Sequence, residues 1–132
     1  RSCTSGVGVV ARRSMSEKRT RELVRKRSTL IYEMMMPTWI DTVNPVCEFC
    51  GKRSLDEMHH RKYRSQGGPW CPSNIIGLCW QCHKQATLYP QWAYKLGLSV
   101  AGSDEPGEVP VAVWYNEQVV FLDLHGGYRT AS

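Results

Sequence analysis

The longest regular pattern of apolar and polar positions lies near the N-terminus. Residues 16–36 contain neither Gly nor Pro, and apolar positions recur along one side of this run: Leu23, Val24, Leu30, Ile31 and Met34. Cations fill much of the remainder: Lys18, Arg19, Arg21, Arg25, Lys26 and Arg27. This pattern predicts a basic amphipathic helix that begins after Ser16 as N-cap and stops before Pro37. Such a helix either packs its apolar stripe on a core or serves as a phosphate-contacting arm, and the two roles are compatible.

Shorter patterns follow, and they mix the periods of strands and helices. Two strands are predicted at Leu55–His60 and Asn74–Leu78, separated by a polar loop that contains Gly67-Gly68-Pro69. A helix should run from Cys79 to about Leu88. The later predicted elements are a short helix with Pro90 in its first turn, Gln91–Leu96, ended by Gly97, and a hairpin of Val109–Trp114 and Val119–Leu124. The fold class expected is α+β.

Four regions follow from these patterns. Residues 1–15 are expected to be a disordered tail, in which residues before Met15 read as an extension, and residues 16–45 to be the basic helix and a linker. Residues 46–98 should form the central core, and residues 99–132 a C-terminal loop and hairpin that frays after Gly126.

The charge is concentrated at one end of the chain. The 132 residues carry 17 Lys and Arg against 12 Asp and Glu, a formal net charge of +5. Residues 1–36 hold nine of these cations and three of the acids. An acidic partner is expected, DNA first, gripped by an N-terminal basic arm on a nearly neutral core. We find no stretch of transmembrane length and no secretory segment, and expect a cytoplasmic protein with no membrane partner.

Four of the six cysteines form two chelating pairs. Cys47-x2-Cys50 and Cys79-x2-Cys82 each make a tight turn that aims two sulfurs at one point, which favours structural zinc over a disulfide framework. Cys3 and Cys71 belong to neither pair. A redox-sensing zinc protein is an alternative use of the same thiols.

A second set of metal-binding side chains lies between and beside these pairs. His59, His60, Asn74 and His83 fall within the same stretch of chain. Four thiolates already complete a tetrahedral zinc shell, so these imidazoles are left for another task. A second divalent cation, held for chemistry on phosphate, is the natural candidate.

The stretch from Cys47 to about Tyr89 resembles the HNH endonuclease family, in particular its phage-encoded and actinobacterial type with a four-cysteine zinc knuckle. The resemblance is carried by the two cysteine pairs and by the run His59–Gly68, and does not cover the N-terminal helix. It implies a small ββα-metal (His-Me finger) core and divalent-metal-dependent hydrolysis of DNA. His59 and His83 match the catalytic metal ligands, His60 the general base, and Asn74 the residue that braces the loop and orients the base.

Further expectations attach to the neighbours of this motif. DNA contacts are predicted for Arg61, Lys62, Arg64, Arg21 and Arg25, with Gln66 either a phosphate contact or a solvated loop residue. Arg61 and Lys62 should also help to keep His60 neutral. Trp70, Trp80 and Trp92 are interpreted as core or knuckle packing, Glu57 as a weak supporting carboxylate, and His125 as a surface residue.

Several alternatives stay open at this level. Adjacent histidines on a strand face opposite ways, so one alternative is that only one of the two serves the site and the other is structural. A second alternative is that His83 replaces Cys82 as a zinc ligand. A non-catalytic zinc-knuckle DNA-binding protein is the main rival function. The catalytic ion is Mg²⁺, Mn²⁺, Ni²⁺ or Zn²⁺, and a homodimer, phage packaging machinery, restriction and homing are all compatible with the pattern.

Overall fold

The structure is a computed structural model that describes residues 15–35, 45–114 and 118–130. Residues 1–14 of the predicted tail, the linker before Pro45 and the centre of the predicted C-terminal turn lie outside the described residues. The helices are α1 (Glu17–Met35), α2 (Trp80–Leu88) and α3 (Pro90–Lys95), with short 3-10 turns at Arg64–Gln66 and Pro106–Glu108. The strands are β1 (Glu57–His60), β2 (Ile75–Leu78), β3 (Val111–Val113), β4 (Gln118–Leu122) and β5 (Tyr128–Thr130).

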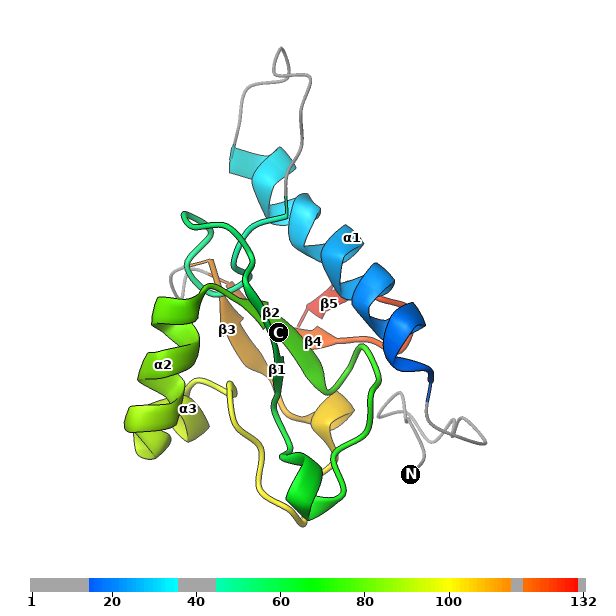
Figure 1. Cartoon of the computed structure of the whole chain (residues 1–132), viewed down its shortest axis with the longest axis vertical. Helices are drawn as coiled ribbons and strands as arrows, with labels where there is room; N and C mark the ends of the chain where they lie inside the picture. The colour runs from blue at the N-terminus through cyan, green and yellow to red at the C-terminus, as the bar shows by residue number, and fades with distance from the viewer. Residues whose placement is uncertain (1–14, 36–44, 115–117, 131–132) are drawn as a thin grey trace.

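The elements confirm the α+β class. An antiparallel pair, β1 and β2, lies at the centre, with α2 and α3 on one side and α1 on the other (Figure 1). A second antiparallel sheet has the strand order β3-β4-β5. The order β1, β2, α2 is the one expected for the core between the two cysteine pairs.

Strand β2 is the buried centre of this arrangement. All four of its residues are buried, as the continuous aliphatic run predicts. Gly77 allows helix α1 and the segment before β1 to approach β2 closely, because a Cβ there would lie 2.2 Å from Leu55 Cδ1 and 3.3 Å from Val24 Cγ1. Helix α1 and the segment before β1 therefore meet over this glycine.

Helix α1 forms where it was predicted, and Val24 of the predicted apolar side is buried, but polar residues of the helix are buried with it. The Arg19 N–H donates to Ser16 Oγ at 3.1 Å, which confirms the N-cap. Leu30 is 39% exposed, whereas the buried residues are Thr20, Val24, Arg27 and Ser28. The placement of Arg27 among the solvated cations is therefore wrong.

Arg27 is buried because a carboxylate and two carbonyls receive its guanidinium. Its Nε and Nη2 donate to Glu48 Oε1 and Oε2 at 2.6 and 2.9 Å. Its remaining bonds go to the carbonyls of Pro72 at 2.7 Å and Ile75 at 2.6 Å. This ion pair ties α1 to the first cysteine turn and to the start of β2. Buried charges need such complete pairing to be tolerated.

The C-terminal region has one strand more than predicted. The segment after Gly126 was expected to fray, but Tyr128–Thr130 pairs with β4 as β5, so that expectation is wrong. The Asp123 carboxylate accepts from the N–H groups of His125 and Gly127 at 2.8 Å each, which fixes the turn. The Tyr128 hydroxyl donates to Glu48 Oε1 at 2.6 Å and anchors the strand. His125 is exposed, as expected.

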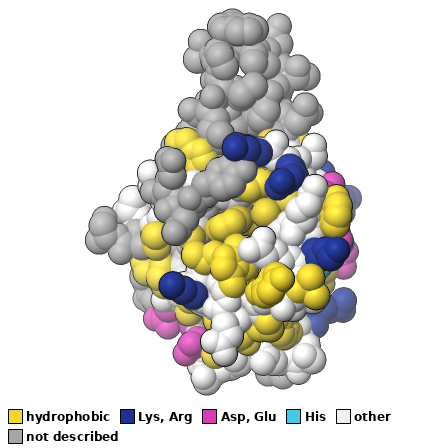
Figure 2. All heavy atoms as spheres, turned by 90° about the vertical axis from the view of Figure 1, so that its left-hand side faces the viewer, with side chains coloured by type: hydrophobic (Ala, Val, Ile, Leu, Met, Phe, Trp, Pro, Cys, Tyr) yellow, Lys and Arg dark blue, Asp and Glu magenta, His cyan; other side chains and the backbone are white. Residues whose placement is uncertain are grey.

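The face formed by α2 and α3 exposes several large apolar side chains. Trp80 is 53% exposed and Leu88 59%, and Figure 2, which views this side, shows hydrophobic side chains interrupted by Lys and Arg. Trp80 is therefore not a core residue, whereas Trp92 does pack, edge to face on Phe49 at 5.4 Å. None of the helices in the described ranges is long and apolar enough to cross a membrane.

Candidate functional site

The two cysteine pairs converge into one enclosed cluster. Cys47, Cys50, Cys79 and Cys82 are all buried, and their sulfurs lie within 4.8 Å of one another. A tetrahedral zinc ion with sulfurs at about 2.3 Å requires sulfur separations near ~3.8 Å. The Cys50 and Cys79 sulfurs are 4.0 Å apart, so the donor set fits a zinc ion.

Local groups support negative charge on these sulfurs. The Cys50 N–H points to Cys47 Sγ at 3.4 Å and the Cys82 N–H to Cys79 Sγ at 3.5 Å, one such bond in each chelating turn. The Arg53 guanidinium lies 3.9 and 4.0 Å from the sulfurs of Cys50 and Cys79. Such outer contacts orient thiolate ligands and stabilise the ion that they hold.

The β1–β2 hairpin carries the histidines to one end of the sheet. Strand β1 pairs in regular register, with His59 opposite Ile76 and His60 opposite Ile75. His60 is the last residue of the strand, so the chain turns away immediately after it. Both histidines therefore line the same hollow of about 340 Å³, together with His83, Tyr63, Arg64, Met58, Ser65 and Thr87.

His59 and His83 face each other at this hollow. Their ring centroids are 5.1 Å apart. His59 Nε2 lies 2.6 Å from the Leu98 carbonyl oxygen, to which only a protonated nitrogen can donate. This leaves His59 Nδ1 as the nitrogen with a lone pair. Burial lowers the pKa of His59 from 6.5 to about 4, the Leu98 carbonyl acting in the opposite direction, and the ring is neutral near pH 7.

A carboxylate fixes the orientation of the second ring. Glu57 Oε2 lies against His83 Nδ1, and Glu57 lies two positions before His59 on the same face of β1. Since Nδ1 of His83 faces the carboxylate, Nε2 is the nitrogen left for a metal. A divalent ion held by these two nitrogens would keep further positions for water or phosphate oxygens.

His60 occupies a different environment at the same hollow. Its ring packs edge to face on Trp70, with centroids 4.6 Å apart. Its Nε2 atom is covered and has no hydrogen-bond partner in the described part of the chain. Burial and then Arg64 lower the pKa of His60 below 6.5. The direction is the one expected, although Arg64 and Arg21 are the cations responsible, in place of Arg61 and Lys62.

Asn74 braces the long loop between the two strands. Its side-chain oxygen accepts from the Lys62 N–H at 2.8 Å, and its amide nitrogen donates to the carbonyls of Lys62 and Pro69, each at 3.1 Å. Gly68 makes this closure possible, because a Cβ there would lie 1.7 Å from the Lys62 carbonyl oxygen. Asn74 precedes β2, outside the strand in which it was predicted.

Arg61 cannot reach a nucleic acid, and its assignment as a DNA contact is wrong. The side chain is fully buried, and its guanidinium donates to four backbone carbonyls: Gly97 at 2.8 Å, Ser73 at 2.9 Å, Pro106 at 3.0 Å and Val109 at 2.6 Å. It joins the hairpin loop to the segment after α3. Burial lowers the pKa of Arg61 to about 9, with repulsion from Arg27 acting in the same direction.

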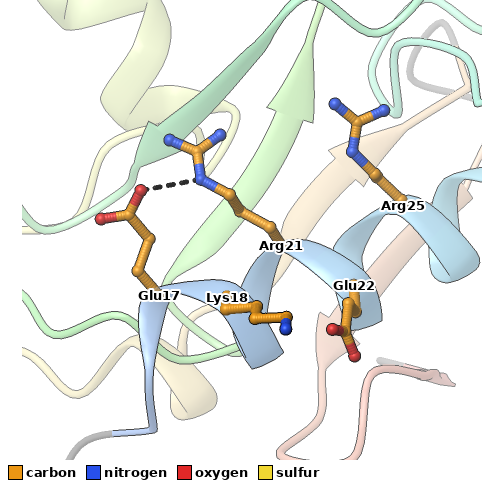
Figure 3. Close-up of a pocket in the computed structure, with 5 residues that line it drawn as sticks. All are labelled: Glu17, Lys18, Arg21, Glu22 and Arg25. Carbon is orange, nitrogen blue, oxygen red and sulfur yellow. Dashed lines mark hydrogen bonds and ion pairs between the residues drawn. The ribbon is translucent and has the colours of Figure 1, made fainter.

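The other predicted DNA contacts remain accessible. Arg64 is exposed at the rim of the hollow, Lys62 is partly buried, and Gln66 is exposed. Arg21 and Arg25 lie side by side on α1 (Figure 3). Sequence patterns did not predict the Leu98 carbonyl, Tyr63 or Thr87 at the site. A backbone carbonyl has no residue-type signal, and the two side chains belong to different elements.

The fold and the site together define a small α+β core stapled by a four-cysteine cluster, with an imidazole cluster at the open end of its hairpin. Residues 47–87 match the family model described as HNH endonuclease. The family is one of nucleases and DNA-binding proteins. No curated protein and no solved structure matches the chain.

Proposed function

We propose that this protein is a divalent-metal-dependent DNA endonuclease. The observation that carries the proposal is the pairing of His59 with His83 beside His60, in a hollow open to solvent. The four-cysteine cluster is complete without these imidazoles. The HNH domain at residues 47–87 supports the same function.

The proposed roles follow from which nitrogens the protein leaves unused. His59 Nδ1 and His83 Nε2 would hold a divalent cation, since their other nitrogens face the Leu98 carbonyl and the Glu57 carboxylate. A bound Mg²⁺, Mn²⁺, Ni²⁺ or Zn²⁺ would supply positive charge to the phosphate and to the departing 3′ oxygen. Two imidazoles leave room in such an ion's shell for oxygen ligands.

His60 is the proposed general base. A neutral imidazole accepts a proton from water, whose oxygen forms the new bond to phosphorus while the bond from phosphorus to the 3′ oxygen breaks. The leaving 3′ oxygen takes a proton from solvent, so the products carry a 5′ phosphate and a 3′ hydroxyl. Asn74 would keep His60 in place through the loop that it braces.

The proposed DNA contacts are the accessible cations around the hollow. Arg64 at its rim, the partly buried Lys62, and Arg21 and Arg25 on α1 would neutralise backbone phosphates. Because one site cuts one strand, a double-strand break would need a homodimer or two successive nicks. Phage genome packaging, restriction and homing are biological settings in which such an enzyme would act.

The test is cleavage of supercoiled plasmid by the zinc-loaded protein with Mg²⁺, Mn²⁺ or Ni²⁺, against an EDTA control. We expect open-circular product that depends on the added ion, with ends that DNA ligase reseals without further treatment. DNA binding without cleavage in any of these ions would contradict the proposal and leave a non-catalytic DNA-binding domain.

A further inference from the structure

Helix α1 lies outside the residues matched by the HNH family model, yet it reaches the candidate base. Trp70 contacts both His60 and Arg21 of the helix: its ring packs on His60 with centroids 4.6 Å apart, and the Arg21 guanidinium carbon lies 5.1 Å from the Trp70 centroid. The first turns of α1 are thus neighbours of the hydrolytic site.

The helix is held rigidly at this position. Arg27 lies six residues after Arg21, about 9 Å along the helix at a rise of ~1.5 Å per residue. Its guanidinium is fully buried and bound to Glu48 and to two backbone carbonyls. The Arg21 side chain therefore projects from a fixed support, as a preorganised catalytic group requires.

Arg21 is oriented while part of its guanidinium stays available. Its Nε donates to Glu17 Oε2 at 2.9 Å, one turn earlier, and Trp70 supplies a flat surface below the cation. Neither Nη nitrogen has a hydrogen-bond partner within the described residues. Figure 3 shows the guanidinium extending away from the helix axis beside that of Arg25. The two Nη nitrogens can therefore donate to two oxygens of one phosphate.

We propose that Arg21 is a catalytic residue, whose guanidinium contacts the phosphate undergoing hydrolysis and stabilises the charge that develops on it, with Trp70 as its platform. This assignment rests on the proposed nuclease function and extends it to an element outside the HNH domain. It distinguishes Arg21 from the other cations of α1, which would only add Coulombic attraction to DNA.

Arg19 offers a matched control on the same helix. It also makes an intrahelical ion pair, with Glu22 at 3.4 Å, and its side chain is 59% exposed against 44% for Arg21. Neither substitution removes a buried group, so both variants should fold. Arg21→Ala and Arg19→Ala then differ in the one property at issue, which is proximity to His60 and Trp70.

The experiment measures kcat and KM for plasmid nicking, and the salt dependence of DNA binding in EDTA. Arg21→Ala should lower kcat about 10²-fold, the loss typical of one preorganised donor to a transition state. Arg19→Ala should leave kcat within about twofold and change only DNA affinity. Equal kcat values for the two variants, with a wild type that cleaves, would overturn the assignment and leave the proposed function intact. A wild type that does not cleave would overturn both.

A double-substitution cycle tests the platform. If Trp70 acts through Arg21, Trp70→Ala combined with Arg21→Ala should lower kcat by less than the product of the two single effects. Effects that multiply would show that Trp70 does not hold Arg21, and its contact with His60 would then be the relevant one.

Discussion

The cysteine cluster and the histidine cluster are adjacent in the chain but differ in their exposure to solvent and in the number of ligands that each offers. Cys82 and His83 are consecutive residues, yet the Cys82 residue is 7% exposed and the His83 side chain is 35% exposed. The cysteine set is complete with four sulfurs, while the two imidazoles would leave positions open on any ion that they held. Enclosure suits an ion that holds the fold together, and openness suits one that meets a substrate.

Removing a thiolate should have the largest effect. Structural zinc contributes about 10–16 kcal/mol of apparent binding energy in small domains, which exceeds the total stability of most domains, about 5–15 kcal/mol. We therefore expect Cys79→Ser to lose zinc and unfold at 25 °C. Circular dichroism and elemental analysis of the purified protein measure both losses.

The neighbouring His83→Ala variant is the control for this comparison. It should keep its zinc and its fold, because the sulfur cluster does not include the imidazole. Loss of zinc from His83→Ala would mean that the two clusters share one ion, and the division drawn between them would be wrong.

Removing the proposed base should give the next largest effect, on rate alone. A general base contributes about 10²–10⁴ in rate, so His60→Ala should lower nicking by that factor while zinc content and melting temperature stay near wild type. Ser65→Ala, at the same hollow, should change the rate by less than about threefold, since its hydroxyl has no proposed role. A fully active His60→Ala would remove His60 from the reaction, and an unfolded one would make its role structural.

The contrast between the clusters also marks what could be predicted from the sequence. The cysteine spacing and the strand–strand–helix order predicted the cluster and the core, because both depend on local chain geometry. Arg27 and Arg61 were misplaced for a common reason. Each is buried by partners distant in sequence, such as Glu48 and the Val109 carbonyl, and a charged residue type normally indicates the surface. Tyr128 was misjudged likewise, since its anchor is also Glu48.

Breaking the Arg27–Glu48 ion pair tests how much of the stability around the cysteine cluster comes from interactions other than metal binding by the sulfurs. Removing one partner of a buried ion pair costs about 3–5 kcal/mol, because the other charge is left unpaired. Glu48→Gln should lose that much in urea denaturation, as it also weakens the contacts to Gly77 and Tyr128. Arg19→Met, at a well-exposed site, should change stability by less than about 0.5 kcal/mol.

The same pair determines how α1 is best tested. A truncation that removes the helix would leave Glu48 buried without its cation, so lost DNA binding would be confounded with lost folding. Single substitutions of exposed cations avoid this. A Glu48→Gln variant as stable as wild type would show that the pair does not anchor the helix, and truncation would then be a fair test.

The smallest predicted effect concerns Glu57, which lies at the exposed histidine cluster. Carboxylates that orient a metal-binding histidine contribute about 10–100-fold to metal affinity. Glu57→Gln should therefore weaken Mn²⁺ or Ni²⁺ binding to the zinc-loaded protein by that factor in calorimetry. Zinc content should not change, because Glu57 contacts His83 and no cysteine of the cluster.

Asp56 provides the matched control, because it is the adjacent carboxylate and accepts instead from the Trp80 N–H at 3.0 Å. Asp56→Asn should leave divalent-ion affinity unchanged and cost a little helix stability. If the two variants bind Mn²⁺ equally well, Glu57 does not orient His83 toward an ion. If only Glu57→Gln is impaired, the open cluster has its own supporting carboxylate, as the enclosed cluster has Arg53.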